Sequence, residues 1–252
     1  MQECLARWTT PNSSTPGQYS PGSSVLRCSV EPPAQQDVVT GQCRDFALNV
    51  AGAAARAKRQ QVNMLAPIRN LIARALGIKT EERAWRIGAG GEAKVGRELD
   101  KLGDGWRVLH AVEVGEHGAD IDHIVIGPPG VISLNSKRHP RGKAWVGDHM
   151  VMVNGQRTDY LPKSRFEATR AARLLSHSCG WSLSVTSAIV FVDAAAFTVK
   201  QMPADVHVTT RRRLVGWLQS LPDTIDETTV EAIFATARLS TTWTTDTAHA
   251  VE

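Results

Sequence analysis

The spacing of apolar residues along the chain divides it into helices and strands. Over residues 83–102 apolar side chains recur at helical spacing, with Val95, Leu99 and Leu102 on one face. The period then changes to two, which predicts strands over 106–114, 120–126, 131–137 and 144–153. Further on, the pattern predicts a helix over 163–175, strands over 183–192 and 206–208, and helices over 211–221 and 226–239. This order predicts an α/β fold in which helices flank a mixed central sheet.

The first third of the chain lacks this regular pattern. Residues 1–34 are rich in Ser, Pro, Thr and Gly, which predicts disorder, whereas residues 35–79 are expected to be helical. The helical part carries no acidic residue between Asp45 and Glu81. It either packs on its own domain with a solvated basic face or docks on a membrane or nucleic acid. The chain is therefore divided into a low-complexity extension over 1–50, a basic helical segment over 51–82, a folded domain over 83–243 and a tail over 244–252.

Composition narrows the class of protein only a little. The net charge is +4 and the sequence pI is near 9.0, values that permit nucleic-acid binding without requiring it. Four cysteines, at positions 4, 28, 43 and 179, show no metal-binding spacing, which favours reduced thiols in a cytoplasmic protein. We see no secretory leader and no apolar run of about 20 residues, so we expect no transmembrane segment. Motifs of nucleotide-binding and hydrolase loops are also absent from the sequence.

Polar residues interrupt two apolar strands at facing positions. If the turn over 127–130 closes a hairpin, Ile126 pairs with Val131, and Ile124 pairs with Ser133. The same register pairs Asp122 with Asn135 and Asp120 with Lys137, all on one face of the sheet. The other face then carries Ile121, His123 and Val125 beside Ile132 and Leu134. Either a salt bridge at the rim of the sheet or a chemical site explains this cluster.

A second carboxylate lies on an apolar helix face. Glu92 precedes Val95 by three residues and Leu99 by seven, so it is expected to point towards the sheet. An ordinary acidic residue in the first turn of a helix is the alternative. Glycines at 88, 90 and 91 indicate a close backbone approach at this point.

Three short motifs occur in one order: "GAGGE" at 88–92, "DIDHIVIGPPGV" at 120–131 and "LNSK" at 134–137. With weaker matches on either side, they resemble the nuclease-related domain, NERD, of the PD-(D/E)xK nuclease superfamily, over roughly residues 51–243. The resemblance implies a restriction-endonuclease-like core. It also implies a site made of a helix Glu, an Asp on one hairpin strand, and an acid two residues before a Lys on the next.

Carried over by motif, these residues are Glu92, Asp122 and Lys137, with Asn135 at the position of the second acid. The resemblance then implies that Mg²⁺ or Mn²⁺ is held by Asp122, Glu92 and the carbonyl of Asn135. Lys137 would position the attacking water and stabilise charge on the phosphate. Because Asn135 removes one negative charge, we expect metal-dependent phosphodiester hydrolysis in DNA processing that is weakened or lost. Asp120 or Glu113 could compensate for the missing acid.

The alternative is a catalytically inactive nucleic-acid-binding or interaction module on a nuclease fold. DNA is the expected partner. The residues expected to contact phosphates are Lys137, Arg138, Arg141, Lys143 and Arg165. His123 is expected to be a core residue or a residue behind the site, not a ligand, because it points to the other face of the sheet. A third interpretation makes the basic segment over 56–79 a recruitment element.

Overall fold

The computed structural model describes residues 43–51, 81–115 and 119–244. The expected disorder of residues 1–34, nearly all of the basic helical segment and most of the tail lie outside this part. The helices are α3 (Glu81–Leu99), α4 (Tyr160–Cys179), α5 (Leu214–Ser220) and α6 (Glu227–Ala237). The strands are β1 (Arg107–Val114), β2 (Ala119–Gly127), β3 (Gly130–Arg138), β4 (Lys143–Val146), β5 (Val151–Val153), β6 (Gln156–Arg157), β7 (Val185–Val192), β8 (Ala196–Val199) and β9 (Val206–Thr210).

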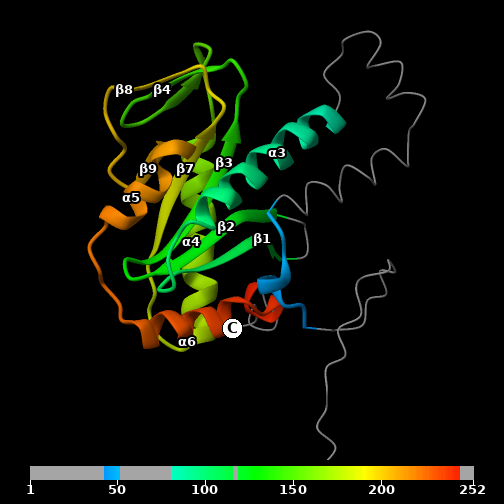
Figure 1. The fold of residues 1–252 in the computed structure, drawn as a ribbon, viewed down its shortest axis with the longest axis vertical. Helices are drawn as coiled ribbons and strands as arrows, with labels where there is room; N and C mark the ends of the chain where they lie inside the picture. The colour runs from blue at the N-terminus through cyan, green and yellow to red at the C-terminus, as the bar shows by residue number, and fades with distance from the viewer. Residues whose placement is uncertain (1–42, 52–80, 116–118, 245–252) are drawn as a thin grey trace, which may run out of the picture. The chain divides into compact units, whose positions relative to one another are not determined.

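Five strands form the central sheet in the order β1-β2-β3-β7-β9 (Figure 1). The first three are antiparallel neighbours, as only a few residues separate them along the chain, whereas β3, β7 and β9 run parallel. A smaller sheet has the order β6-β5-β4-β8. The expected mixed sheet flanked by helices is therefore confirmed.

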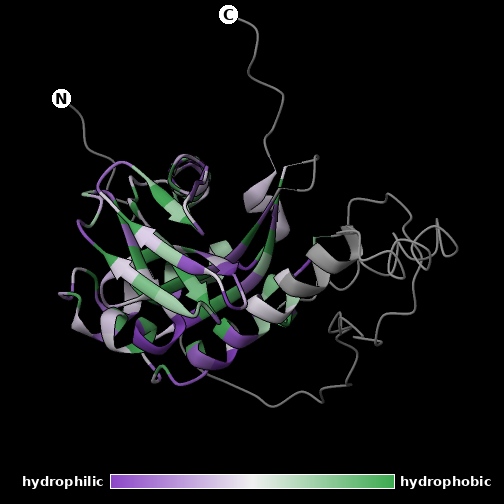
Figure 2. Cartoon of the chain, turned by 90° about the horizontal axis from the view of Figure 1, so that it is seen from above, coloured by the Kyte–Doolittle hydropathy of each residue, from purple (hydrophilic) through white to green (hydrophobic). Residues whose placement is uncertain are grey.

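Helices cover both faces of the central sheet. On one face, Leu174 of α4 and Ile233 of α6 belong to the same buried cluster as Ile124 of β2. On the other, Val95 of α3 and Leu218 of α5 are clustered with strand residues that include Val125, Ile132 and Leu134. Figure 2 shows hydrophobic residues concentrated on the strands between these helix layers. Because side chains along β2 and β3 alternate between the two faces of the sheet, these strands contribute to two separate hydrophobic layers.

Two parts of the domain differ from the sequence prediction. The strand expected over 144–153 is a hairpin of β4 and β5, because Gly147 donates its N–H to the Met150 carbonyl at 2.9 Å and turns the chain. The next turn, Asn154-Gly155, was expected and is confirmed by φ angles of 54° and 78° between β5 and β6. Strand β8 was not expected, because three of its four residues are exposed and leave no apolar alternation.

Residues 43–51 pack onto the domain. Phe46 is 1% exposed and belongs to the cluster beneath α4 and α6, together with Trp243. Asp45 caps a single 3-10 turn at Phe46–Leu48 and accepts hydrogen bonds from Arg238 near the other end of the chain. The helix expected over 35–79 is therefore wrong for this stretch, and a division at residue 50 does not separate it from the domain. The turn ends because Asn49 is extended and donates its side-chain amide to β1 carbonyls.

Candidate active site at the fork between β2 and β3

The predicted hairpin register is confirmed close to the turn and ends before the polar residues. Ile126 pairs with Val131 and Ile124 with Ser133, but the pairing of β2 with β3 stops at His123 and Leu134. The expected backbone pairs Asp122–Asn135 and Asp120–Lys137 do not form. From there β3 continues along β7, so β2 and β3 separate into a fork.

The side chain of Asp122 on β2 reaches across this fork to β3. Its Oδ2 accepts a hydrogen bond of 2.5 Å from the backbone N–H of Ser136, in place of the missing ladder contact. The irregularity begins in β1, where Ala111 has a φ of 50°, a value uncommon for a residue with a side chain. The β1–β2 register runs through His110–His123 and resumes at Val112–Ile121, so Asp122 lies opposite Ala111.

The strict alternation expected along β2 also fails beside this irregularity. Ile121 belongs to the cluster of Ile124 and Ile126 on the α4 side, not to that of Val125. Its ladder partner Val112 belongs to the same cluster, so both strands change face together. The prediction that grouped Ile121 with His123 and Val125 is therefore wrong, because it assumed an unbroken pleat.

Asn135 connects a lysine and a glutamate. It is 4% exposed, and its Nδ2 donates a 2.5 Å hydrogen bond to Oε2 of Glu167 on α4. Its Oδ1 accepts a hydrogen bond from Nζ of Lys137. The two contacts fix the amide orientation, because a carboxylate can only accept and an ammonium can only donate. The Lys137 ammonium also lies 5.3 Å from the ring centroid of Tyr160.

Helix α4 is fixed on the strands close to Glu167. One turn earlier, Ser164 Oγ lies 2.7 Å from Ser187 Oγ on β7, and both serines are buried. At the start of the helix, the Tyr160 hydroxyl lies 2.7 Å from Nε2 of His139, just beyond β3. These contacts fix the position of α4 along the sheet and therefore the point at which Glu167 contacts β3.

Sequence reasoning missed Glu167. A signal was present, because Glu167 follows Ser164 by three residues and precedes Ala171 by four, and both neighbours are buried. The expected helix over 163–175 therefore carried a carboxylate next to its apolar stripe. Glu113, considered as a substitute for the missing acid, instead forms an exposed ion pair with Arg44 at 2.8 Å.

The two carboxyl groups near Lys137 have raised pKa values. Burial raises the pKa of Asp122, and the ammonium of Lys137 and the Ser136 N–H oppose this shift. Burial also raises the pKa of Glu167, opposed by the hydrogen bond from Asn135 and by Lys137, while the negative charge of Asp122 raises it further. Carboxyl groups shifted by burial and by each other are typical of functional sites.

A pocket of about 360 Å³ opens beside these residues, between α4 and the ends of β1 and β2. Glu167 and Asp120 line it together with Ile121 and Phe166. Glu167 and Asp120 are therefore reachable from outside the domain through this pocket, whereas Asp122 does not line it.

Glu92 approaches from the opposite side of the sheet. It is half-buried on α3, whose residues Val95 and Leu99 pack on the face away from α4. The close approach expected from the glycines is confirmed, because a Cβ on Gly91 would lie 2.9 Å from the Cβ of Arg138. Glu92 thus follows the point where α3 crosses the end of β3, and its part in an ion site stays a prediction.

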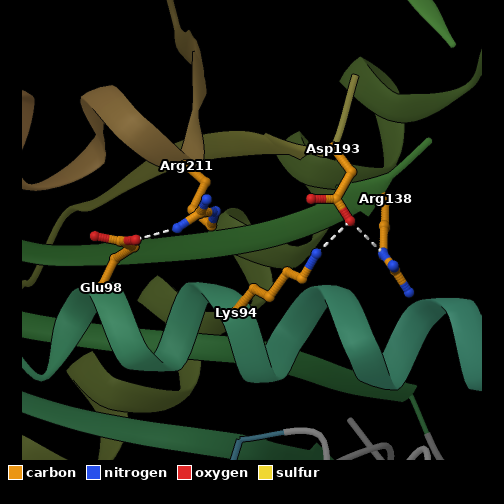
Figure 3. Close-up of polar contacts among 5 residues, drawn as sticks. All are labelled: Lys94, Glu98, Arg138, Asp193 and Arg211. Atoms are coloured by element: carbon orange, nitrogen blue, oxygen red, sulfur yellow. Dashed lines mark hydrogen bonds and ion pairs between the residues drawn. The ribbon is translucent and has the colours of Figure 1, made fainter. Parts of the chain in front are cut away.

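Two of the five basic residues expected to bind phosphate already form ion pairs within the domain. Arg138 shares Oδ2 of Asp193 with Lys94, at 2.7 and 2.6 Å (Figure 3). Burial alone would raise the pKa of Asp193, but the hydrogen bonds from these two cations hold it below its usual range. Arg165 forms a two-fold contact with Asp205, at 2.6 and 2.8 Å.

The remaining basic residues near the fork stay accessible. Arg141 and Lys143 are exposed, and Lys137 is half-buried at the fork. Figure 3 also shows Glu98 of α3 paired with Arg211, so the ion pairs of Lys94 and Glu98 both attach α3 to the domain.

His123 is a core residue, as expected. It has no exposed surface, and its Nδ1 lies 2.8 Å from Nδ1 of His110. Burial, with the neighbouring His110 adding to it, puts the pKa of His123 well below its usual range. The ring is therefore neutral, and one of the two Nδ1 atoms carries the shared proton.

Within the part of the chain that the structure describes, no three His, Cys, Asp or Glu side chains are grouped as a metal site. None of the described helices has the length and apolar character needed to cross a membrane.

Comparisons with known proteins agree with the geometry. A mixed sheet with helices on both faces is consistent with a nuclease-like α/β core. Residues 87–192 match the model of the NERD family, the nuclease-related domain. Neither the curated proteins nor the solved structures contain a match to the chain.

Proposed function

We propose that this domain hydrolyses phosphodiester bonds in DNA with a divalent cation, and that Glu167 replaces the carboxylate missing at position 135. The observation that carries the proposal is the 2.5 Å contact of Asn135 with Glu167, next to Lys137 and close to Asp122. Asn135 thereby brings a carboxylate from α4 to the position where the family motif has its own acid.

The available donors suit Mg²⁺ or Mn²⁺. Mg²⁺ is usually held by one or two carboxylates with water and substrate phosphate, and Asp122 and Glu167 offer two. Asn135 is the least suited of the expected ligands, because its carbonyl oxygen already accepts from Lys137. When bound, such an ion would polarise the phosphate and lower the pKa of a bound water.

The protein side chains have separate roles in this proposal. Asp122 and Glu167 hold the ion, and Asn135 is a positioning residue that keeps Glu167 and Lys137 apart at fixed distances. Lys137 donates to a phosphate oxygen as negative charge develops there. Glu92 adds a ligand from the α3 side if its carboxylate reaches the fork.

The inactive binding module has weaker support. Arg138 and Arg165, two of its five expected phosphate contacts, already form ion pairs inside the domain. Asp122 and Glu167 would also repel phosphate at the fork unless a cation lies between them.

The test is cleavage of plasmid and oligonucleotide DNA with Mg²⁺ or Mn²⁺, together with Mn²⁺ binding measured by calorimetry. Asp122→Ala should abolish both, and Glu167→Gln should weaken both at least about tenfold. Glu227→Gln, at an exposed carboxylate on α6, is the matched control and should change neither. Unchanged cleavage in Asp122→Ala or Glu167→Gln would contradict the proposed site.

A further inference from the structure

The pocket beside Glu167 has features that hydrolysis alone does not require. Phe166 on α4 lines the pocket, and it is 65% exposed, so its aromatic ring lies at the pocket rim. Most large apolar side chains of the domain are buried, so an exposed phenyl ring in a pocket wall is unusual. Ile121 provides an apolar wall within the same pocket.

Two cations accompany the aromatic ring. Arg170 lines the pocket, and among the described residues no carboxylate forms an ion pair with it. Its guanidinium lies against Gly115, where a Cβ would collide with it and where φ is 71°. Lys163 pairs with Asp159 at 2.6 Å, but both side chains are mostly exposed, so this pair contributes little and can be exchanged for a phosphate.

The size of the pocket limits what it can hold. Its volume of about 360 Å³ is at the lower end of ordinary ligand sites, which span roughly 300–1,000 Å³. A base with its sugar is small enough for such a volume. A ring that stacks on a base also needs a free base face, which single strands offer and an intact duplex does not.

We propose that this pocket binds one unpaired nucleotide of single-stranded DNA, with its base stacked on Phe166 and its flanking phosphates on Lys163 and Arg170. The inference rests on the proposed function, because Glu167 belongs both to the fork and to the pocket wall. A nucleotide in the pocket brings the adjoining phosphate to Asp122, Glu167 and Lys137. The preferred substrate is then a single strand or a frayed end.

The test measures binding separately from cleavage. Fluorescence anisotropy with the full chain and Ca²⁺ in place of Mg²⁺, so that a cation lies between the carboxylates, gives the Kd for a labelled single-stranded oligonucleotide and for a blunt duplex of the same sequence. Phe166→Ala should weaken single-strand binding by roughly 5- to 100-fold and leave duplex binding unchanged, as expected for one lost stacking contact. Phe166→Trp should retain it. Trp181→Ala, an exposed aromatic just beyond the other end of α4, is the matched control and should have no effect.

A second pair of variants tests the phosphate contact. Arg170→Ala should weaken single-strand binding and reduce its salt dependence, whereas Arg173→Ala, exposed on the next turn of α4, should do neither. Equal affinity of Phe166→Ala and the unaltered chain, or an equal loss on duplex, would overturn the proposal. Absence of single-strand binding by the unaltered chain would do so as well.

The two proposals can fail independently. If the chain cleaves no DNA with Mg²⁺ but Phe166→Ala loses single-strand binding, the hydrolysis fails and the nucleotide pocket stands. If the chain cleaves DNA and Phe166→Ala binds normally, the hydrolysis stands and the pocket is wrong.

Discussion

Replacing Asn135 by aspartate reverses the polarity of its contact with Glu167. The change is nearly isosteric, but the donor Nδ2, 2.5 Å from Oε2 of Glu167, becomes a carboxylate oxygen. Because Asn135 is 4% exposed, water cannot separate the two facing oxygens. The variant therefore contains two buried acids in contact, although it restores the residue type of the family motif.

Two effects destabilise the folded variant and a third partly offsets them. Two unit charges about 4 Å apart repel by roughly 4 kcal/mol at an effective dielectric constant of about 20. The lost hydrogen bond to a charged group adds about 1.5–3 kcal/mol. Attraction between Lys137 and the introduced charge offsets a part, so we expect the free energy of unfolding to fall by about 2–4 kcal/mol near pH 7.

This loss should depend on pH. Like-charge repulsion and burial raise the pKa of the facing carboxyls in the folded variant above their unfolded values. The penalty is then full at high pH and decreases as the pH falls through the raised pKa, because the folded variant binds a proton that restores the hydrogen bond. The loss should therefore be smaller at acidic pH than near pH 7.

Urea unfolding followed by tryptophan fluorescence in EDTA measures these changes, since the chain has seven tryptophans. The double variant Asn135→Asp/Glu167→Gln exchanges donor and acceptor and should recover to within about 1 kcal/mol of the unaltered chain. Adding Mn²⁺ should also stabilise the single variant, by placing a cation between its carboxylates. If the single and double variants are equally stable, the contact between β3 and α4 is not as described.

Two further predictions test the packing that supports the site. Gly91→Ala should destabilise the domain by about 1–2 kcal/mol, because overpacking against Arg138 exceeds the gain in helix propensity, whereas Gly216→Ala in α5, with nothing within 4 Å, should stabilise it by about 0.5–1 kcal/mol. Urea midpoints that shift in the same direction would contradict this. Phe46→Ala should cost about 3–5 kcal/mol in the same assay, because the ring is 1% exposed in the core, and a loss below about 1 kcal/mol would detach residues 43–51 from the domain.

Local rules account for the parts of the fold that the sequence predicted well. The β2–β3 register near Ile124 and Ile126 followed from a four-residue turn and from alternation, both of which are encoded within a few residues. The left-handed angles at Asn154 and Gly155 also follow from residue type alone.

Features that depend on a third element could not be predicted in this way. The predicted β2–β3 register is correct as far as His123 and fails at Asp122. The irregularity arises at Ala111 on β1, which the hairpin sequence does not include. Glu167 was not predicted as a site residue because its role depends on where α4 lies against β3. Its contact with Asn135 joins residues 32 positions apart. Phe46 was assigned to an extension because the short segment around it has no strand or helix pattern that continues into the domain, and several of its core partners, such as Trp243, lie near the other end of the domain.

The departure at Asn135 has a different meaning once α4 is in place. From the motif alone it is a lost charge, and the expected consequence is a weak or inactive site. In the fold, Asn135 donates to a carboxylate and accepts from an ammonium, so two carboxylates and one lysine remain together at the fork. Because the second acid is on α4, any shift of this helix moves that acid and the pocket wall together. If a nucleotide binds against α4 as proposed, it would act directly on the geometry of the acidic pair and so couple recognition of the strand to the arrangement proposed to cleave it.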